Sequence, residues 1–242
     1  MSDPTNRPPR WERRKEDRPA ELLAAALELF VERGYAATRL DEVAARAGVS
    51  KGTLYLYFEN KEDLFKTVVR ETIVPQLHEM RQGVEGSSEP SAVLLRGFLH
   101  DWWRRFGATQ LGGIAKLVVA EAGNFPEVAR FFQEEVIEPH STLLASIIER
   151  GIARGEFAPV DARIAAHLWI APLALKAIWT HSMDALCPPD ARVAPERLMR
   201  AHLDHVLAAL RPQPPAAPKA RPAKAARPKA RKAPRARTGD AE

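Results

Sequence analysis

The amino-acid sequence predicts an all-α protein, with an N-terminal three-helix domain that contains a helix–turn–helix and a larger helical domain after it. Three observations support this fold class. Apolar residues recur at helical spacing along most of the 242 residues. Helix-capping residues and glycines bound these segments, and no segment shows the alternation of a strand. A hydrophobic content of 45% is enough for a substantial core.

The first expected helix follows a polar leader. Residues 1–16 contain proline and charges of both signs, a composition that favours disorder. We expect the helix to start near Asp17 to Pro19, because aspartate suits an N-cap and proline suits a first turn. Gly34 is expected to end it in a left-handed conformation, with Tyr35 packing back on it. The apolar face of this helix comprises Leu23, Ala26, Leu27, Phe30 and Val31.

Two short helices joined by a tight turn come next. Thr38 and Asp41 have the spacing of a capping box, so Thr38 is expected to cap a helix that Gly48 ends. After a single intervening residue, Ser50 caps the next helix, over residues 51–58. A short connection with a glycine is typical of a helix–turn–helix, whose second helix can enter the DNA major groove.

The second of these helices has two different faces. At 100° per residue, Leu54 and Phe58 point toward the core, while Gly52, Thr53 and Leu56 lie on the opposite side. A glycine would let the backbone approach DNA closely, and an exposed leucine offers an apolar contact to a thymine methyl group. Because this face has few side chains that form bidentate hydrogen bonds, DNA shape is expected to contribute to recognition.

A longer helix is expected after Asn60 and Asp63, which again have capping spacing. Pro75 lies inside it and predicts a kink, since proline removes a backbone hydrogen bond and clashes with the preceding turn. A loop is expected over residues 83–90. The apolar positions of this helix are Leu64, Val68, Ile73, Leu77 and Met80.

Further helices are expected in the rest of the chain, the third of them bent near Pro139. The last two have more apolar surface than one chain needs for its core, which predicts a homodimer formed through residues 161–210. The expected helices span residues 90–106, 111–122, 124–154, 161–184 and 195–210.

The composition changes abruptly at Arg211. Residues 211–242 contain ten Lys and Arg, two acids and seven prolines, so a disordered basic tail is expected that contacts DNA without reading its sequence. The chain's net charge of +5 and the tail's +8 leave −3 for the other 210 residues, so any nucleic-acid site on the folded body must be local. The remaining boundaries are expected at 1–16 for the leader, 17–63 for the helix–turn–helix domain and 64–210 for the second domain.

The chain resembles the TetR family of one-component transcriptional regulators over about residues 18–65. The resemblance rests on RGY at 33–35, VAARAGVS at 43–50, KGTLYLYF at 51–58 and NK at 60–61, in this order and at fixed spacing. The segments AEA at 120–122 and NFPE at 124–127 resemble the AcrR and AefR-like branch. This resemblance implies a homodimer that binds a palindromic operator, with a small-molecule effector site in the second domain.

Candidate DNA contacts lie on both helices of the helix–turn–helix. Hydroxyl and ammonium groups bind phosphates and set the register, while side chains that face the groove read bases. Arg39 is expected to reach a base or a phosphate, and Ser50 lies at the start of the recognition helix. The expected phosphate contacts are Thr38, Tyr55, Tyr57 and Lys61, and the expected groove-facing residues are Lys51, Gly52, Thr53 and Leu56.

An effector pocket in the second domain is expected to be largely apolar, with a polar side chain that orients the ligand. The candidate lining residues are Trp102, Phe106, Leu117, Trp169, Leu173, Lys176 and Trp179. The alternative for each of these aromatic residues is an ordinary place in the hydrophobic core.

Neither catalysis nor a bound cofactor is expected. No nucleophile elbow, phosphate loop or paired carboxylates are found, and His202 and His205 lack a third partner for a metal site. A single cysteine, Cys187, excludes an intramolecular disulfide and fits a reducing compartment. Without an apolar signal core or a membrane span, the protein is expected to be cytoplasmic, bacterial and nucleoid-associated when bound to DNA.

The preferred hypothesis is a homodimeric, sequence-specific repressor that a small effector releases from DNA. Two alternatives stay open at this point. One is an architectural DNA-binding protein dominated by its basic tail, which deletion of residues 211–242 would distinguish. The other is a small-molecule-binding protein with a vestigial helix–turn–helix. A double substitution of Tyr55 and Lys61 that leaves DNA affinity unchanged would support this second alternative.

Overall fold

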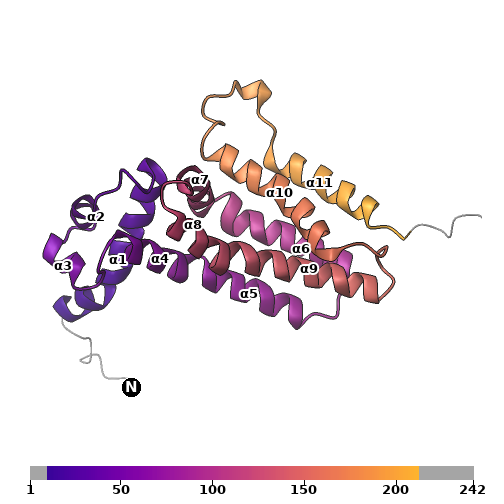
Figure 1. Ribbon diagram of the computed structural model, residues 1–242, viewed down its shortest axis with the longest axis horizontal. Coiled ribbons are helices and arrows are strands. Elements are labelled where there is room, and N and C mark those ends of the chain that lie inside the picture. The colour runs from indigo at the N-terminus through magenta and orange to yellow at the C-terminus, as the bar shows by residue number, and fades with distance from the viewer. Residues whose placement is uncertain (1–9, 213–242) are drawn as a thin grey trace, which may run out of the picture. The chain divides into compact units, whose positions relative to one another are not determined.

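The structure is a computed structural model that describes the backbone of residues 10–212 and the side chains of residues 18–212. The predicted leader lies outside the described residues up to position 9, as does the predicted tail from position 213. Every regular element within residues 10–212 is helical, which confirms the all-α class (Figure 1). No helix in that range is long and apolar enough to cross a membrane.

The helices follow the expected order along the chain. The N-terminal part contains α1 (Arg10–Arg33), α2 (Leu40–Arg46), α3 (Lys51–Tyr55) and α4 (Lys61–Thr72). The C-terminal part contains α5 (Val74–Glu85), α6 (Ser91–Trp102), α7 (Leu111–Glu121), α8 (Pro126–Phe132), α9 (Glu138–Ala153), α10 (Ala162–Thr180) and α11 (Pro195–Ala209). Two π-helical turns, Trp103–Gly107 and Gln133–Ile137, extend α6 and join α8 to α9. The second turn lies just before Pro139, where a bend was expected.

Helix α1 begins earlier than its sequence signals indicate. Its first residue is Arg10, and Pro19 lies inside the helix, so the expected start near Asp17 to Pro19 is wrong. The preceding residues, mainly Arg, Lys and Glu, are strong helix formers. Adding residues to an existing helix is far easier than nucleating one. Gly34 ends the helix as predicted, at φ 85°.

The expected kinked helix is two consecutive helices. Helix α4 ends at Thr72, Ile73 has φ −100°, and α5 begins at Val74 with Pro75 in its first turn. Proline fits this position because its missing N–H needs no partner there. Helix α5 continues to Glu85, so the expected loop over residues 83–90 is shorter than predicted.

An aromatic cluster holds the N-terminal helices together. The ring of Phe30 in α1 contacts the ring of Tyr35, in the loop after α1, with centroids 5.8 Å apart. It also contacts the ring of Phe65 in α4, with centroids 5.5 Å apart. Tyr35 also meets Phe65 edge-on at 5.7 Å. All three side chains are buried, so the prediction that Tyr35 packs back on α1 is confirmed.

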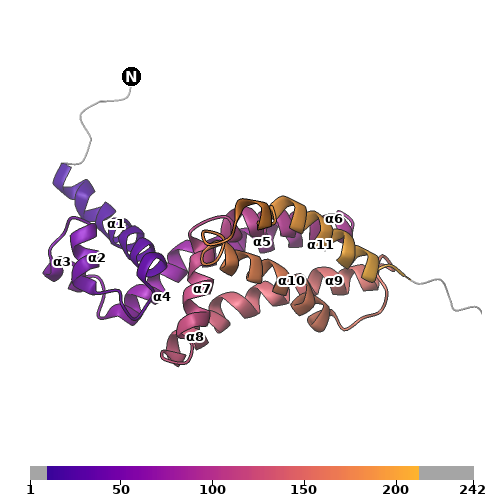
Figure 2. The same ribbon diagram turned by 90° about the horizontal axis from the view of Figure 1, so that it is seen from above.

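Helix α7 lies between the N-terminal helices and the C-terminal bundle in both views (Figures 1 and 2). It contacts α1 on one side and α10 on the other. Gly113 makes the contact with α1 very close, since a Cβ there would lie 2.6 Å from Cγ1 of Val31. The lack of a side chain at this position therefore lets α1 and α7 approach each other.

Candidate DNA-binding surface and effector pocket

The helix–turn–helix is built by the local signals that the sequence contains. Gly48 has φ 69°, in the left-handed region that favours glycine. The Val49 N–H donates to the carbonyl of Ala44 at 2.9 Å and closes the turn. Ser50 caps α3, as predicted, since its Oγ accepts from the Thr53 N–H at 3.1 Å. Helix α3 ends at Tyr55, three residues short of the expected end.

The two faces of α3 are oriented as predicted. Leu54 and Phe58 are buried against the core, while Leu56 is 82% exposed, an unusual position for a leucine. A Cβ at Gly52 would meet only Ser50 Oγ, at 3.8 Å. Packing within the protein therefore does not require a glycine there. Lys51 and Tyr55 are also exposed, with Lys51 Nζ 6.0 Å from the Tyr55 ring centroid.

Lys61 is engaged within the protein. Its Nζ donates to the carbonyls of Tyr35, Ala36 and Thr38 at 2.7, 3.0 and 3.1 Å, which uses all three of its donor hydrogens. Partial burial lowers its pKa, and the Coulombic effect of Glu121 opposes this. In this geometry Lys61 fastens α4 to the loop before α2.

Two other candidate contacts are also occupied within the protein. Thr38 is 1% exposed, and its hydroxyl lies within donor distance of the carbonyls of Leu29 and Gly34. It does not cap α2, whose N-cap is Arg39, so the expected capping box is wrong. The physical reason is that Thr38 lies under the end of α1, where its hydroxyl donates its one hydrogen to a backbone carbonyl, at the shortest distance that of Gly34. The side chain of Arg39 donates to both carboxylate oxygens of Asp41 at 3.2 Å.

The loop between α1 and α2 is joined to the turn between α7 and α8. The Ala36 N–H donates to Oε1 of Glu121 at 3.1 Å. The Tyr35 and Phe125 rings meet edge-on with centroids 4.7 Å apart, and Lys61 Nζ lies 6.0 Å from the centroid of Phe125. The segment 120–127 that carries the second resemblance therefore contacts the helix–turn–helix domain directly.

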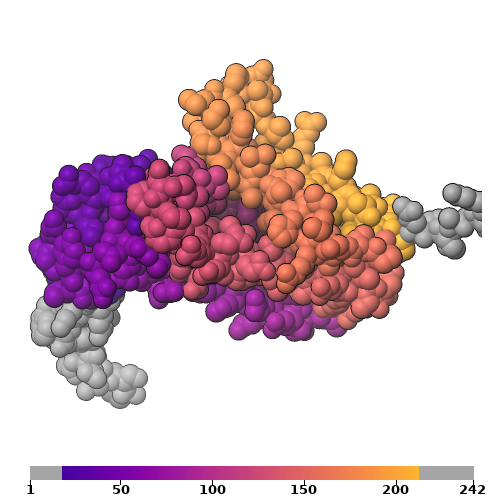
Figure 3. Space-filling model, viewed as in Figure 1, coloured from indigo at the N-terminus to yellow at the C-terminus, as the bar shows by residue number. Residues whose placement is uncertain are grey.

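A cavity of about 190 Å³ lies among α6, α7, α9 and α10. Two of the predicted lining residues, Trp102 and Phe106, line it. The other five predicted residues are not among those that line it. Its remaining walls are mostly aliphatic, with Ala115 from α7 and Ala174 from α10 among them. The surface is visibly hollowed between the α7–α8 and α10 segments (Figure 3).

These five residues lie elsewhere in the structure. Leu117, Trp169 and Leu173 are buried in the core. Lys176 is buried and forms an ion pair with the partly buried Asp184, whose Oδ2 lies 2.7 Å from its Nζ. Trp179 is 42% exposed on the outer side of α10. Trp169, Leu173 and Lys176 share a helix face in sequence, but only the packing of α10 against α7 and α9 decides which side meets the cavity.

The polar group at the cavity is one that the sequence did not single out. His140 of α9 lines it beside Ser141, and its Nδ1 lies 2.7 Å from the carbonyl of Val136. Burial lowers the pKa of His140 to about 4. The only signal in the sequence is a lone histidine in an apolar helix, which usually indicates a satisfied core residue.

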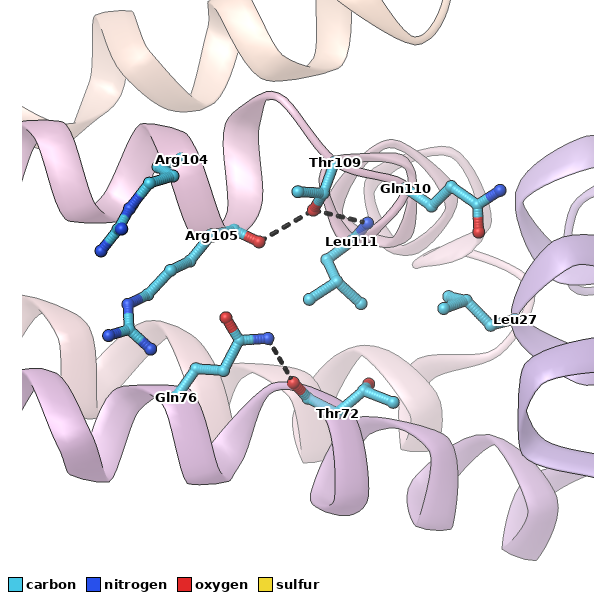
Figure 4. A pocket seen from close by; sticks show the side chains of 8 residues that line it. All are labelled: Leu27, Thr72, Gln76, Arg104, Arg105, Thr109, Gln110 and Leu111. Carbon is cyan, nitrogen blue, oxygen red and sulfur yellow. Dashed lines mark hydrogen bonds between the residues drawn. The ribbon is translucent and has the colours of Figure 1, made fainter. Parts of the chain in front are cut away.

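A second, open cleft of about 690 Å³ lies near the break between α4 and α5. In Figure 4, Leu111 and Leu27 point into it from opposite sides, while Arg105 and Gln76 lie along its polar edge. Leu111 also lines the apolar cavity, so the two spaces share a wall. Gln76 is held in place by a hydrogen bond from its Nε2 to the carbonyl of Thr72 at 2.7 Å.

Within the described residues, no three His, Cys, Asp or Glu side chains gather as a metal site would require. His202 lies 2.7 Å from the carbonyl of Trp169 through its Nε2, and burial lowers its pKa. Its partner is therefore the backbone of α10.

Comparisons with known proteins match both parts of the chain. The family described as bacterial regulatory proteins, tetR family, matches residues 22–68. The family described as tetracyclin repressor-like, C-terminal domain, matches residues 95–194. Between them they cover the helix–turn–helix and most of the helical part that follows it.

Individual relatives agree with these families. The chain is 31% identical over 160 residues to the uncharacterized HTH-type transcriptional regulator YhgD of Bacillus subtilis, covering 64% of this chain and 79% of that protein. It is 33% identical over 81 residues to the regulator AcrR of Shigella flexneri, covering 33% and 37%. The structure of Bacillus subtilis FadR in complex with stearoyl-CoA superposes with a TM-score of 0.62 at 20% identity, covering 79% and 98%. That likeness concerns the fold alone.

Proposed function

The chain belongs to the TetR family of bacterial regulatory proteins, and from this premise we propose that it is a homodimeric repressor that a small, largely apolar effector releases from DNA. It is a DNA-binding transcriptional regulator and not an enzyme. The observation that carries the proposal is the solvent-facing side of α3, where an exposed leucine and an unneeded glycine lie together. Both are explained by a partner that approaches this face closely.

The proposed DNA contacts fall into two groups. Lys51, Gly52, Thr53 and Leu56 would face the groove, and Tyr55 would contact a phosphate beside them. Ser50, Arg39 and Tyr57 keep their proposed places at the margin of this face. Thr38 and Lys61 would act indirectly, since their polar atoms already bond to backbone carbonyls. Their role in the proposal is to hold the loop before α2, and with it the orientation of α3.

The proposed homodimer forms through the outer face of α10. Ile164, Leu168, Leu175 and Trp179 are exposed and recur along that face at intervals close to whole turns. Such a stripe is typical of an interface between helices. A symmetric pair would place two copies of α3 in successive major grooves, about 34–36 Å apart.

The dimer is tested by a charge on this stripe. We expect Leu168→Glu to sediment as a monomer and to lose most of its operator affinity, because an unpaired carboxylate would be buried at the interface. Val93→Glu is the matched control, since Val93 is an exposed apolar residue on α6. A Leu168→Glu protein that remains dimeric would overturn the proposed interface.

The proposed effector site is the apolar cavity, with α7 as its link to DNA. Gly112 and Ala115 line the cavity from α7, Gly113 packs on α1, and Glu121 at the end of the same helix holds the loop before α2. An effector that displaces α7 would therefore move both contacts. Ile73, at the break before Pro75, also lines the cavity and offers a second route through α4.

The proposed effector is compact. The structural neighbour FadR of Bacillus subtilis was solved with stearoyl-CoA. The cavity here has a volume of about 190 Å³, little more than the ~150 Å³ of an apolar cavity that binds benzene. A long acyl chain would need the cavity to open further, so we propose a smaller ligand for this chain.

The function is tested by selecting bound sequences from random DNA with the full-length protein. We expect a palindrome to emerge, because a two-fold symmetric dimer reads two inverted half-sites. The proposal would be overturned by a non-palindromic consensus, or by binding with no sequence preference that disappears when residues 211–242 are deleted. Repression is then measured as reporter output from a promoter that overlaps the selected site.

A further inference from the structure

The imidazole of His140 presents one nitrogen to the protein and leaves the other without a partner. Nδ1 lies 2.7 Å from the carbonyl oxygen of Val136, one turn earlier on the same helical segment. A carbonyl oxygen only accepts hydrogen bonds, so Nδ1 must carry the ring's proton. Burial lowers the pKa of His140 to about 4, so the ring is neutral near pH 7 and Nε2 keeps its lone pair.

Nε2 is a buried acceptor with no hydrogen-bond partner in the described part of the chain. Nδ1 and Nε2 point in widely different directions, so with Nδ1 turned to the Val136 carbonyl, the Nε2 lone pair is directed away from it, on a ring that lines the cavity. His140 is 94% buried and stacks edge-on with Phe106, which also lines the cavity. A buried acceptor left unpaired is unfavourable, so this nitrogen is expected to receive a donor when the cavity is filled.

The other residues that line the cavity restrict the charge and the size of a ligand that can bind there. No Lys, Arg, Asp or Glu side chain is among its lining residues, and the only other polar side chains there are Ser141 and Trp102. Nothing in the lining would neutralise an anion, and the lone pair on Nε2 would repel one. The cavity of about 190 Å³ fits a substituted benzene ring.

We infer that the cavity selects a compact, neutral, apolar molecule that carries one hydroxyl or N–H group, and that this group donates its hydrogen to Nε2 of His140. A phenol is the simplest such ligand. The inference rests on the proposed function, because it takes the cavity as the effector site. It excludes carboxylates, and ethers of the same size should bind less well because they have no hydrogen to donate.

The test compares three ligands with similar rings. Binding of 4-methylphenol, 4-methylanisole and 4-methylbenzoate to the full-length protein is measured by isothermal titration calorimetry at pH 7.5. We expect the phenol to bind about ten-fold more tightly than the ether, because the ether leaves Nε2 unpaired. The benzoate should bind more weakly than both. This comparison uses only the unaltered chain and needs no variant to fold.

Three variants then test whether His140 is the residue that causes the preference for the phenol over the ether. In His140→Phe the acceptor is lost at nearly constant shape, so the order of phenol and ether should reverse, since the phenol hydroxyl is now buried unpaired. His167→Phe is the matched control: the Nδ1 of His167 lies 2.9 Å from the Arg163 carbonyl four residues earlier, but this histidine is exposed and outside the cavity. Ala174→Leu fills the cavity and should abolish binding of all three ligands.

The outcomes separate this inference from the proposed function. Equal affinities for phenol and ether, tighter binding of the benzoate, or no binding of any of the three would overturn the inference. A phenol preference that His140→Phe leaves intact would also overturn it. Operator release is measured separately by fluorescence anisotropy. Phenol binding through His140 without release would uphold the inference and contradict the proposed effector mechanism. Release of the operator by a ligand that has no hydrogen to donate would uphold the proposed effector mechanism and contradict the inference.

Discussion

The exposed face of α3 and the apolar cavity each contain one side chain that does not match its surroundings, but the mismatch is of the opposite kind. At the end of α3, the apolar side chain of Leu56 is largely exposed to solvent. In the cavity, Nε2 of His140 is a polar group surrounded by apolar side chains. Each is unfavourable in the free protein, and each is relieved by a partner of matching chemistry. The difference is that substitutions on α3 should change binding alone, whereas substitutions around the cavity and the domain junction should also change stability.

The largest expected effect is the pH dependence that His140 adds to stability. Burial lowers its pKa from 6.5 to about 4. Between these values the unfolded chain binds a proton that the folded chain does not, so the free energy of unfolding falls as the pH falls through this window. The loss approaches about 3 kcal/mol at its lower end and vanishes above pH 6.5. Chemical denaturation of the wild type and His140→Phe from pH 7.5 to pH 4 measures it.

The difference between the two proteins isolates this histidine, because titrating carboxylates contribute equally to both. Parallel pH profiles for the wild type and His140→Phe would show that the ring is protonated in the folded state, and would remove the contrast between the two regions.

A smaller loss of stability is expected for Lys61→Met. The substitution leaves three backbone carbonyls without their donor, so the free energy of unfolding should fall by about 2 kcal/mol. Urea denaturation measures the change. Lys51→Met is the matched control on the exposed face and should stay within about 0.5 kcal/mol of the wild type. Unchanged stability for Lys61→Met, together with lost DNA binding, would return Lys61 to the set of phosphate contacts.

Leu56→Ala should weaken operator binding about five- to ten-fold, because it removes an apolar contact to a base while the free protein loses no buried surface. Its unfolding curve should match that of the wild type, since Leu56 is 82% exposed. Fluorescence anisotropy with the selected operator measures the affinity. Val93→Ala, on α6, serves as the control. Equal affinity of Leu56→Ala and the wild type would mean that this leucine faces away from DNA.

The smallest expected effect concerns Pro75. It lies in the first turn of α5, beside Ile73 at the cavity wall. Pro75→Ala should let α4 and α5 join more readily, and should reduce the effector-induced change in operator affinity about two- to three-fold. Affinities with and without effector measure this coupling. If the ratio of the operator affinities with and without effector is unaltered, the coupling does not pass through the break between α4 and α5. The contact between α7 and α1 would then be the remaining route from the cavity to the helix–turn–helix.

Local sequence patterns were sufficient to predict those features of the structure that depend on residues close together in the chain. The positions of Gly48 and Ser50 indicated the turn and the cap. The helical period placed Leu54 inside and Leu56 outside. The same reasoning failed for Thr38, which has the spacing of a cap but lies under the end of α1. Its partner, the carbonyl of Gly34, becomes available only because α1 ends there.

By itself, the sequence determined the helical class, the helix–turn–helix and the family, because periodicity, caps and ordered motifs are local properties of the chain. Only the tertiary structure decided what each lysine and histidine contacts. Lys61 bonds to a loop 23 to 26 positions earlier in the chain, Lys176 pairs with Asp184 instead of lining the pocket, and His140 becomes the polar group of a cavity formed by four helices. Such partners come together through packing between distant segments, which no local spacing records.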